Sequence, residues 1–230
     1  MSRSQEPIHP VYLPFSRESL SEHFVDEAHL DYFTTSALRY AEYMHRYGPD
    51  CEGIPITNEV RFGRQIERDE RFWTATALKA VFDQNRFADA LRLAFGERPP
   101  FEGFLSWHDC IGEKKDQQLR FEVGISSPQT YRDALRERYR SQGDRAHLVP
   151  YVRDAGKGRT AYEGATKVDA VLRNTKTGIS VMFEAKALSD ISHEVTFDLC
   201  RNQLARNIDI MVDEESSFLL EKDKRALAIL

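Results

Sequence analysis

The first half of the chain carries apolar residues at the spacing of α-helices. From Asp69 to Gln84 they recur every three or four positions, which predicts a helix with Phe72 and Trp73 in the core. Three other segments show the same spacing and predict helices: Thr34–Tyr47, Phe87–Phe95 and Tyr131–Tyr139. The first of these is expected to begin at Thr34 or Thr35, which are suitable capping residues. The opening 20 residues hold three prolines and predict an extended or loosely ordered arm.

The second half changes to the alternation of apolar and polar residues that is typical of β-strands. Residues 119–125 alternate in this way, and so do Thr166–Arg173 and Ile179–Ala185, which flank a turn-forming segment and predict a β-hairpin. A helix is expected over Val195–Met211, with Leu199, Leu204, Ile208 and Met211 on its apolar side, and a strand over Arg225–Leu230. This order predicts an α/β (α+β) fold, with a mixed β-sheet flanked by helices. We expect two regions: a helix-rich N-terminal part (1–145) and a core (146–230).

The predicted hairpin brings acidic residues together. On its first strand Thr166, Val168, Ala170 and Leu172 are expected to share the apolar face, which leaves Asp169 on the other. If Asn174 pairs with Ile179, Asp169 lies directly opposite Glu184, and Lys186 follows two residues later on the same face. Two carboxylates with Cβ atoms about 5 Å apart repel each other unless a cation lies between them.

This set of side chains suits phosphodiester hydrolysis. Carboxylate oxygens are the ligands that Mg²⁺ or Mn²⁺ prefers, together with water and substrate phosphate. A bound metal ion polarises the phosphoryl oxygen and makes hydroxide available near neutral pH. Lys186 would add a compact positive charge that orients the water or offsets charge on the phosphorus. The alternative reading is a surface hairpin with an incidental ion pair.

At these residues the sequence resembles the PD-(D/E)XK, or restriction-endonuclease-like, nuclease superfamily. The matching segments are Val168–Leu172 and Val181–Lys186, separated by a turn and followed by a helix. The resemblance covers about a third of the chain. It implies a restriction-endonuclease-like core, a metal ion held by Asp169, Glu184 and the main-chain carbonyl of Ala185, and a catalytic Lys186. It is compatible with a homodimer, the arrangement common where both strands of a duplex are cut.

Further candidates surround this motif. Glu163 shares the strand parity of Asp169 and is either a further metal ligand, as in several branches of the family, or a loop acid. The RecB-like branch carries a Gln on the helix after the motif and a Tyr four residues later; Gln203 matches the first, and Asn207 stands in place of the second. Basic residues that either contact the DNA backbone or belong to a plain connection or solvated surface are Lys157, Arg159, Lys167, Arg201 and Arg206.

Composition does not argue against a nuclease, and the basic segment before the motif is either part of a DNA-binding surface or a solvated helix face. The 230 residues are 41% hydrophobic and carry a net charge of −5, which argues against a protein that simply coats nucleic acid. Residues 131–160 hold eight basic and four acidic residues, a local charge of +4 just before the motif. No apolar run is long enough to span a membrane and no signal peptide is recognisable, so we expect a cytoplasmic protein with no membrane partner. The three cysteines are scattered and are expected to be reduced.

The leading hypothesis is therefore a Mg²⁺-dependent deoxyribonuclease, an endonuclease or exonuclease whose partner is DNA and whose role lies in restriction, repair or defence. The first alternative is a catalytically inactive module of the same fold that binds nucleic acid or a protein partner. The second is a metal-dependent hydrolase of another substrate, such as a nucleotide. For the N-terminal half the sequence leaves three roles open, namely substrate specificity, dimerisation and partner binding.

Overall fold

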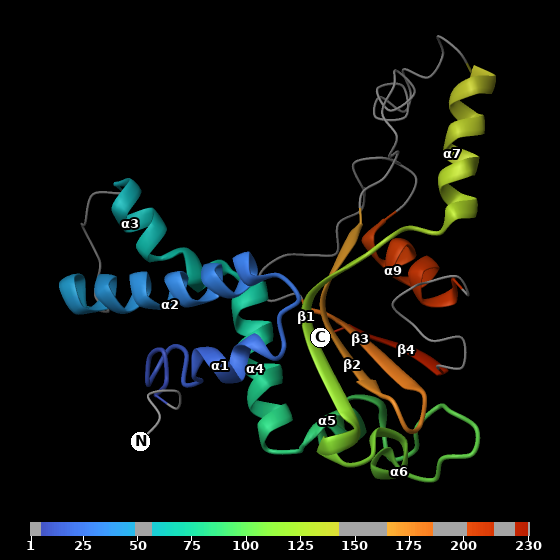
Figure 1. Ribbon diagram of the computed structural model, residues 1–230, viewed down its shortest axis with the longest axis horizontal. Helices are drawn as coiled ribbons and strands as arrows, with labels where there is room; N and C mark the ends of the chain where they lie inside the picture. Colours follow the sequence, from blue (N-terminus) through green and yellow to red (C-terminus); the bar gives the residue numbers. More distant parts are fainter. Residues whose placement is uncertain (1–5, 49–56, 143–164, 186–201, 214–223, 230) are drawn as a thin grey trace.

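The computed structural model describes residues 6–48, 57–142, 165–185, 202–213 and 224–229 (Figure 1). The chain is a mixed α+β protein in which several helices precede and flank one β-sheet. The helical elements before the sheet are α1 (Arg17–Ser21), α2 (Glu27–Tyr47), α3 (Asn58–Gly63), η2 (Gln65–Arg68), α4 (Glu70–Asp83), α5 (Phe87–Phe95), α6 (Trp107–Ile111) and η3 (Lys114–Asp116). Among the described residues, none of the helices combines the length and apolar character needed to cross a membrane.

The sheet has four strands in the order β1-β2-β3-β4, and it is mixed, as predicted. β1 (Gln117–Ile125), β2 (Thr166–Asn174) and β3 (Ile179–Glu184) are antiparallel, and β4 (Lys224–Ile229) is parallel to β3. Two further helices complete the fold: α7 (Gln129–Gln142) after β1, and α9 (Gln203–Val212) between β3 and β4. The sheet thus draws strands from both of the regions expected from the sequence. The division of the chain at residue 145 stays a prediction.

Most predicted helices are confirmed, but α2 begins earlier than expected. It begins at Glu27 and is capped by Asp26, whose side chain accepts a hydrogen bond from the backbone N–H of Ala28. Thr34, the expected cap, lies inside the helix and donates its hydroxyl to the carbonyl oxygen of Leu30. An aspartate at an N-cap satisfies an otherwise unpaired N–H group, so the helix extends back to it. The prediction of a cap at Thr34 or Thr35 was therefore wrong.

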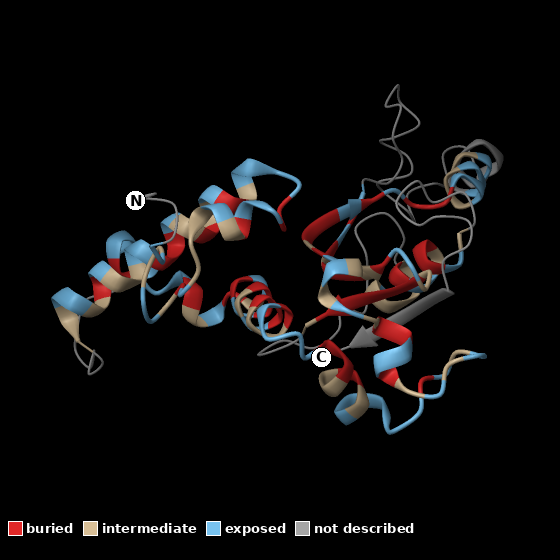
Figure 2. Cartoon of the chain, turned by 60° about the horizontal axis from the view of Figure 1, so that its bottom comes forward, coloured by how far each residue is buried: buried red, intermediate tan, exposed pale blue. Residues whose placement is uncertain are grey.

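The N-terminal segment and Trp73 also differ from expectation. Leu13 and Leu20 are fully buried in the main core, so residues 6–20 fold against the helices and do not form an extended arm. Phe72 is buried as predicted, whereas the side chain of Trp73 is 42% exposed. Its indole N–H donates to the carbonyl oxygen of Ile66 at 2.7 Å, which fixes the ring at the surface. Figure 2 shows buried residues interspersed with exposed ones along the N-terminal helices, and buried residues along β1, β2 and β3.

The sheet contacts two different apolar clusters, and the second also includes Val171 and Met182 from the middle of β2 and β3. Phe121, Ala170 and Leu172 belong to the large core that includes α4 and α5. Val123 and Val168 belong instead to a second cluster with residues of α9. The expectation that Val168 and Ala170 share one face is therefore wrong. The change from one cluster to the other occurs between Val168 and Ala170, at Asp169. The neighbouring residue of β1 is Glu122, whose φ angle is positive (52°).

Candidate active site

The hairpin register places the two predicted acids opposite each other. β2 and β3 pair from Asn174↔Ile179 to Ala170↔Phe183, so the next position in this register sets Asp169 against Glu184. The register is fixed at the turn by Asn174, whose side-chain oxygen accepts from the backbone N–H groups of Lys176 and Thr177. The predicted pairing of Asn174 with Ile179 is confirmed, and Asp169 opposite Glu184 is the extension of that register by one position.

The backbone and α9 hold both carboxylates in place. Asp169 Oδ2 accepts a hydrogen bond from the backbone N–H of Ala185, with 2.9 Å between the two atoms. Glu184 is only 4% exposed, and its two oxygens accept from the side-chain amides of Gln203 and Asn207, the latter at 3.2 Å. These amides supply the partners that a buried carboxylate requires.

Helix α9 is arranged to provide those amides. Asn202 caps it by accepting from the backbone N–H of Ala205, so Gln203 is its first residue. Asn207 lies four residues later and on the same side of the helix, because residues i and i+4 are neighbours. The predicted apolar side was wrong for Ile208, which is exposed, while the helix buries Asn207, Ile210 and Met211. The face of α9 that packs on the sheet therefore includes its polar contact with Glu184.

Sequence reasoning did not identify Asn207 as a site residue. It was noted only as a departure from the tyrosine of one nuclease branch. Its side chain is 1% exposed, and within the described part of the chain its Oδ1 atom has no hydrogen-bond partner. The four-residue spacing from Gln203 was the signal that could have found it.

A third acid, Glu122, occupies the neighbouring position on β1. The pairs Phe121↔Ala170 and Val123↔Val168 flank it, which puts Glu122 opposite Asp169 in the register. Its side chain is 6% exposed, and Oε2 finds no hydrogen-bond partner among the described residues. Burial raises the pKa of the Glu122 carboxyl, and the nearby charge of Arg71 opposes that rise. Glu122 occupies an ordinary polar position in the alternation of residues 119–125, so nothing in the sequence signals its burial.

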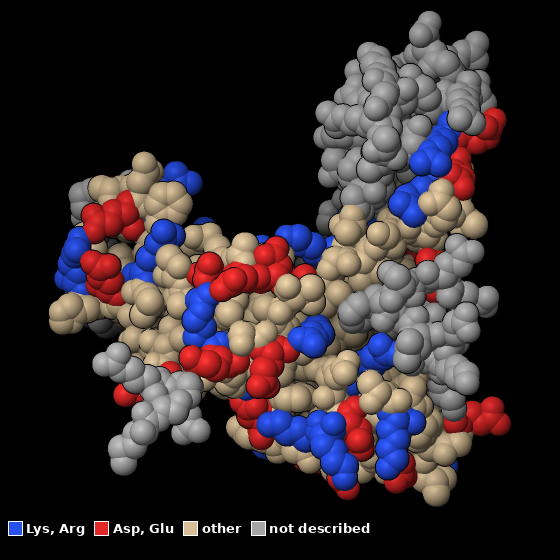
Figure 3. Space-filling model, in the orientation of Figure 1, with Lys and Arg blue, Asp and Glu red and all other residues tan. Residues whose placement is uncertain are grey.

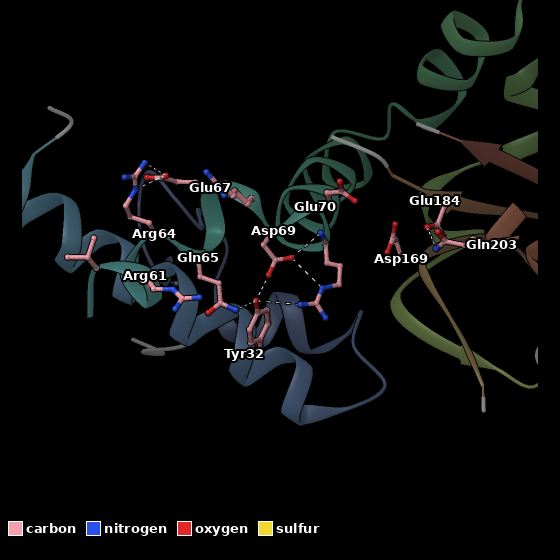
Figure 4. Close-up of a pocket in the computed structure, with 13 residues that line it drawn as sticks. Tyr32, Arg61, Arg64, Gln65, Glu67, Asp69, Glu70, Asp169, Glu184 and Gln203 are labelled. Atoms are coloured by element: carbon pink, nitrogen blue, oxygen red, sulfur yellow. Dashed lines mark hydrogen bonds and ion pairs between the residues drawn. The ribbon is translucent and has the colours of Figure 1, made fainter. Parts of the chain in front are cut away.

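Asp169 and Glu184 line a cleft of about 850 Å³. Its opposite wall comes from the N-terminal helices, as Figure 4 shows, with Asp69 and Glu70 between Arg61 and Arg64 of that wall and the two site acids. Residues lining the cleft on the N-terminal side include Tyr32, Arg61, Arg64, Arg68, Glu70 and Arg71. Figure 3 shows acidic and basic side chains interspersed over the N-terminal helices, with no large patch of one sign.

Of the predicted site residues, Asp169, Glu184, Ala185 and Gln203 are brought together. Lys167 lies on β2, exposed, with its Nζ atom 3.1 Å from Nε2 of His29, and Arg206 is half-buried on α9. The remaining candidates lie outside the described residues: Lys157, Arg159, Glu163, Lys186 and Arg201.

The donor set fits a magnesium ion. Within the described ranges no three side chains of His, Cys, Asp or Glu are grouped to hold a metal ion. Mg²⁺, however, is usually bound through one or two carboxylates, and water and substrate phosphate complete its coordination. Asp169 and Glu184 provide two carboxylates in one cleft, and each carboxylate has more acceptor sites than one hydrogen bond occupies.

Comparison with models of known families, with curated proteins and with solved structures gives no match for this chain. The resemblance to restriction-endonuclease-like nucleases therefore depends on the motif residues and their register. What the structure establishes is the mixed α+β fold and a cleft lined by Asp169, Glu184 and Gln203, with the buried amide of Asn207 also bonded to Glu184.

Proposed function

We propose that this protein is a metal-dependent nuclease of the PD-(D/E)XK type that hydrolyses phosphodiester bonds in DNA. The observation that carries the proposal is the cleft in which Asp169 and Glu184, from adjacent strands, lie with Gln203 of α9. Three features of the motif support the assignment to this superfamily: the hairpin, the small residue after Glu184, and the helix that follows with its glutamine.

In this proposal each residue has a defined part. Asp169, Glu184 and the carbonyl group of Ala185 hold Mg²⁺ or Mn²⁺, which when bound supplies a Lewis acid and a hydroxide near neutral pH. Gln203 and Asn207 fix the orientation of Glu184, and the N–H group of Ala185 fixes that of Asp169. Lys186 is assigned the orientation of the attacking water and the compensation of phosphate charge.

The buried state of Glu184 favours a binding role for this carboxylate over a purely structural one. A buried carboxylate is expensive to keep charged, and a hairpin that only needed stability would gain more from an apolar residue there. Two amides from another element are used instead to hold it beside Asp169. This arrangement is typical of a metal ligand supported by hydrogen bonds from neighbouring side chains.

The test is cleavage of linear, circular and single-stranded DNA by the purified full chain, with and without Mg²⁺. We expect Mg²⁺-dependent cleavage that is lost in Asp169→Asn and in Lys186→Ala, with circular dichroism unchanged. Glu113→Gln serves as a matched control, because Glu113 is an exposed acid outside the cleft, paired with Lys115. Cleavage by Asp169→Asn at the wild-type rate would refute the assignment. Hydrolysis of a nucleotide without cleavage of DNA would replace it with the second alternative.

A further inference from the structure

The cleft has a second wall, and it is rich in arginine. Residues of α3, η2 and the start of α4 line it on the side opposite Asp169 and Glu184. Arg61, Arg64, Arg68 and Arg71 all line the cleft, although the segment that carries them is two helices joined by a 3-10 turn and not one continuous helix. None of them was singled out in the sequence, because the same segment holds as many acids as arginines.

Two of these arginines are already paired. Arg64 bonds to Glu67 at 2.7 Å, and Arg71 bonds to Asp69 at 3.3 Å and stacks over the ring of Tyr32. The hydroxyl of Tyr32 donates to Asp69, so this part of the wall forms a connected network. The charges of Arg64 and Arg71 are largely compensated by their acidic partners, so their role in the wall is structural.

Arg61 and Arg68 differ from them. Both side chains are exposed and line the cleft, and neither forms an ion pair or hydrogen bond with another described side chain. Exposed arginines are commonly only solvated. Here, however, two such guanidinium groups face the same cleft as two carboxylates that would repel an approaching anion.

We infer that Arg61 and Arg68 bind the phosphodiester backbone of a nucleic acid strand in this cleft, on phosphates that flank the one beside Asp169 and Glu184. A guanidinium group presents a planar fork of donors that matches phosphate oxygens. Cations on one wall offset the repulsion between the phosphates and the carboxylates on the other wall. Contacts to the phosphates position the backbone but give no sequence specificity. The inference rests on the proposed function for its substrate and assigns the N-terminal helices a part in the site.

Binding in the absence of metal tests this separately from cleavage. Fluorescence anisotropy of a labelled oligodeoxynucleotide, as a single strand and as a duplex, is measured with the full chain in EDTA over a range of salt concentrations. For Arg61→Ala/Arg68→Ala we expect affinity to fall about tenfold or more. The slope of log K against log salt should become shallower by roughly 1.4 for a single strand or 1.8 for a duplex, since each lost phosphate contact removes about 0.7 or 0.9. The form of DNA, single strand or duplex, whose binding shows this shallower salt dependence is the one that binds in the cleft.

Arg98→Ala is the matched control, because Arg98 is also exposed, forms no ion pair with a described residue and lies outside the cleft. Wild-type affinity and slope in the double variant would overturn the inference. So would an equal loss in Arg98→Ala, which would indicate a response to net charge alone, and so would the absence of binding by the wild-type chain. Failure of the proposed hydrolysis has a different signature: strand binding that depends on Arg61 and Arg68, with no cleavage when Mg²⁺ is added.

Discussion

The carboxylate of Asp169 accepts a hydrogen bond from the backbone N–H of Ala185, so the end of β3 and the middle of β2 are joined at the candidate site. This bond sets the direction of the acid without using another side chain. The residue after Glu184 can therefore be small, and the backbone there stays close to β2. Asp169 is held by its own hairpin and Glu184 by the amides of α9 before any ligand arrives, which is the kind of preorganisation that metal sites require.

The first prediction concerns stabilisation by metal. Because a ligand that binds only the folded state stabilises it, Mg²⁺ at about 100 times its dissociation constant should add about 2.7 kcal/mol to the free energy of unfolding. For a chain of this size that corresponds to a rise in Tm of roughly 5–10 °C. Asp169→Asn keeps an acceptor for the Ala185 N–H and removes the charge. We expect differential scanning fluorimetry to show the Mg²⁺ shift in the wild type and none in this variant.

The second prediction concerns the amides that hold Glu184. Removing a hydrogen bond to a metal ligand typically lowers metal affinity or activity by about 10- to 100-fold. We expect Gln203→Ala and Asn207→Ala each to weaken Mg²⁺ binding, measured by calorimetry, by that amount. Because both act on one carboxylate, the double variant should lose less than the sum of the two.

Ile208→Ala is the control for this pair, since Ile208 is exposed on the same helix and has no part in the site. Its Mg²⁺ affinity should equal that of the wild type. If the losses of Mg²⁺ affinity in Gln203→Ala and Asn207→Ala were strictly additive, the two amides would act independently and not through the shared carboxylate of Glu184.

The hairpin was predictable because local signals agreed with one another. Alternating apolar residues defined the two strands. With the turn beginning at Asn174, only one register places the apolar residues of both strands on the same face of the hairpin. Once the register was fixed, the pairing of Asp169 with Glu184 followed from the number of residues alone. No tertiary information was needed.

Other features depend on polar contacts between distant segments, which periodicity does not report. Asn207 donates a hydrogen bond to Glu184 and is buried beside Ile210 and Met211, whereas the apolar Ile208 is exposed. Trp73 is held at the surface by a carbonyl group seven residues earlier. The change of face beside Glu122 requires a left-handed backbone angle that favours glycine, and nothing in the sequence marks it.

The third prediction follows from that strained and buried acid. Burial raises the pKa of Glu122, so its protonated form is favoured in the folded state. The stability associated with this proton is present below the ordinary glutamate pKa of 4.5 and is lost as the pH rises through the raised value. At pH 7 we therefore expect Glu122→Gln to unfold at a higher urea concentration than the wild type. At pH 4 the difference should shrink, and a constant difference at both pH values would contradict the argument.

The fourth prediction concerns His23, which connects the N-terminal segment to β1. Its ring Nδ1–H donates to the carbonyl oxygen of Leu119 at 2.9 Å, and its own carbonyl oxygen accepts from the N–H of Phe121. Burial lowers the pKa of His23; the bond to Leu119 opposes this, and the charge of Lys79 adds to it. A depressed histidine pKa means that the unfolded chain binds the proton more readily.

Stability from His23 should therefore be complete above its ordinary pKa of 6.5 and should decline as the pH falls below that value toward the lowered one. His23→Asn offers an amide donor in place of Nδ1–H and does not titrate. We expect urea midpoints of the wild type to fall more between about pH 7.5 and 5.5 than those of His23→Asn, although the variant starts lower because a buried ring has been lost. Parallel midpoint curves for the two proteins would mean that the pKa of His23 is the same in the folded and unfolded states. The join between the N-terminal segment and β1 would then be insensitive to pH.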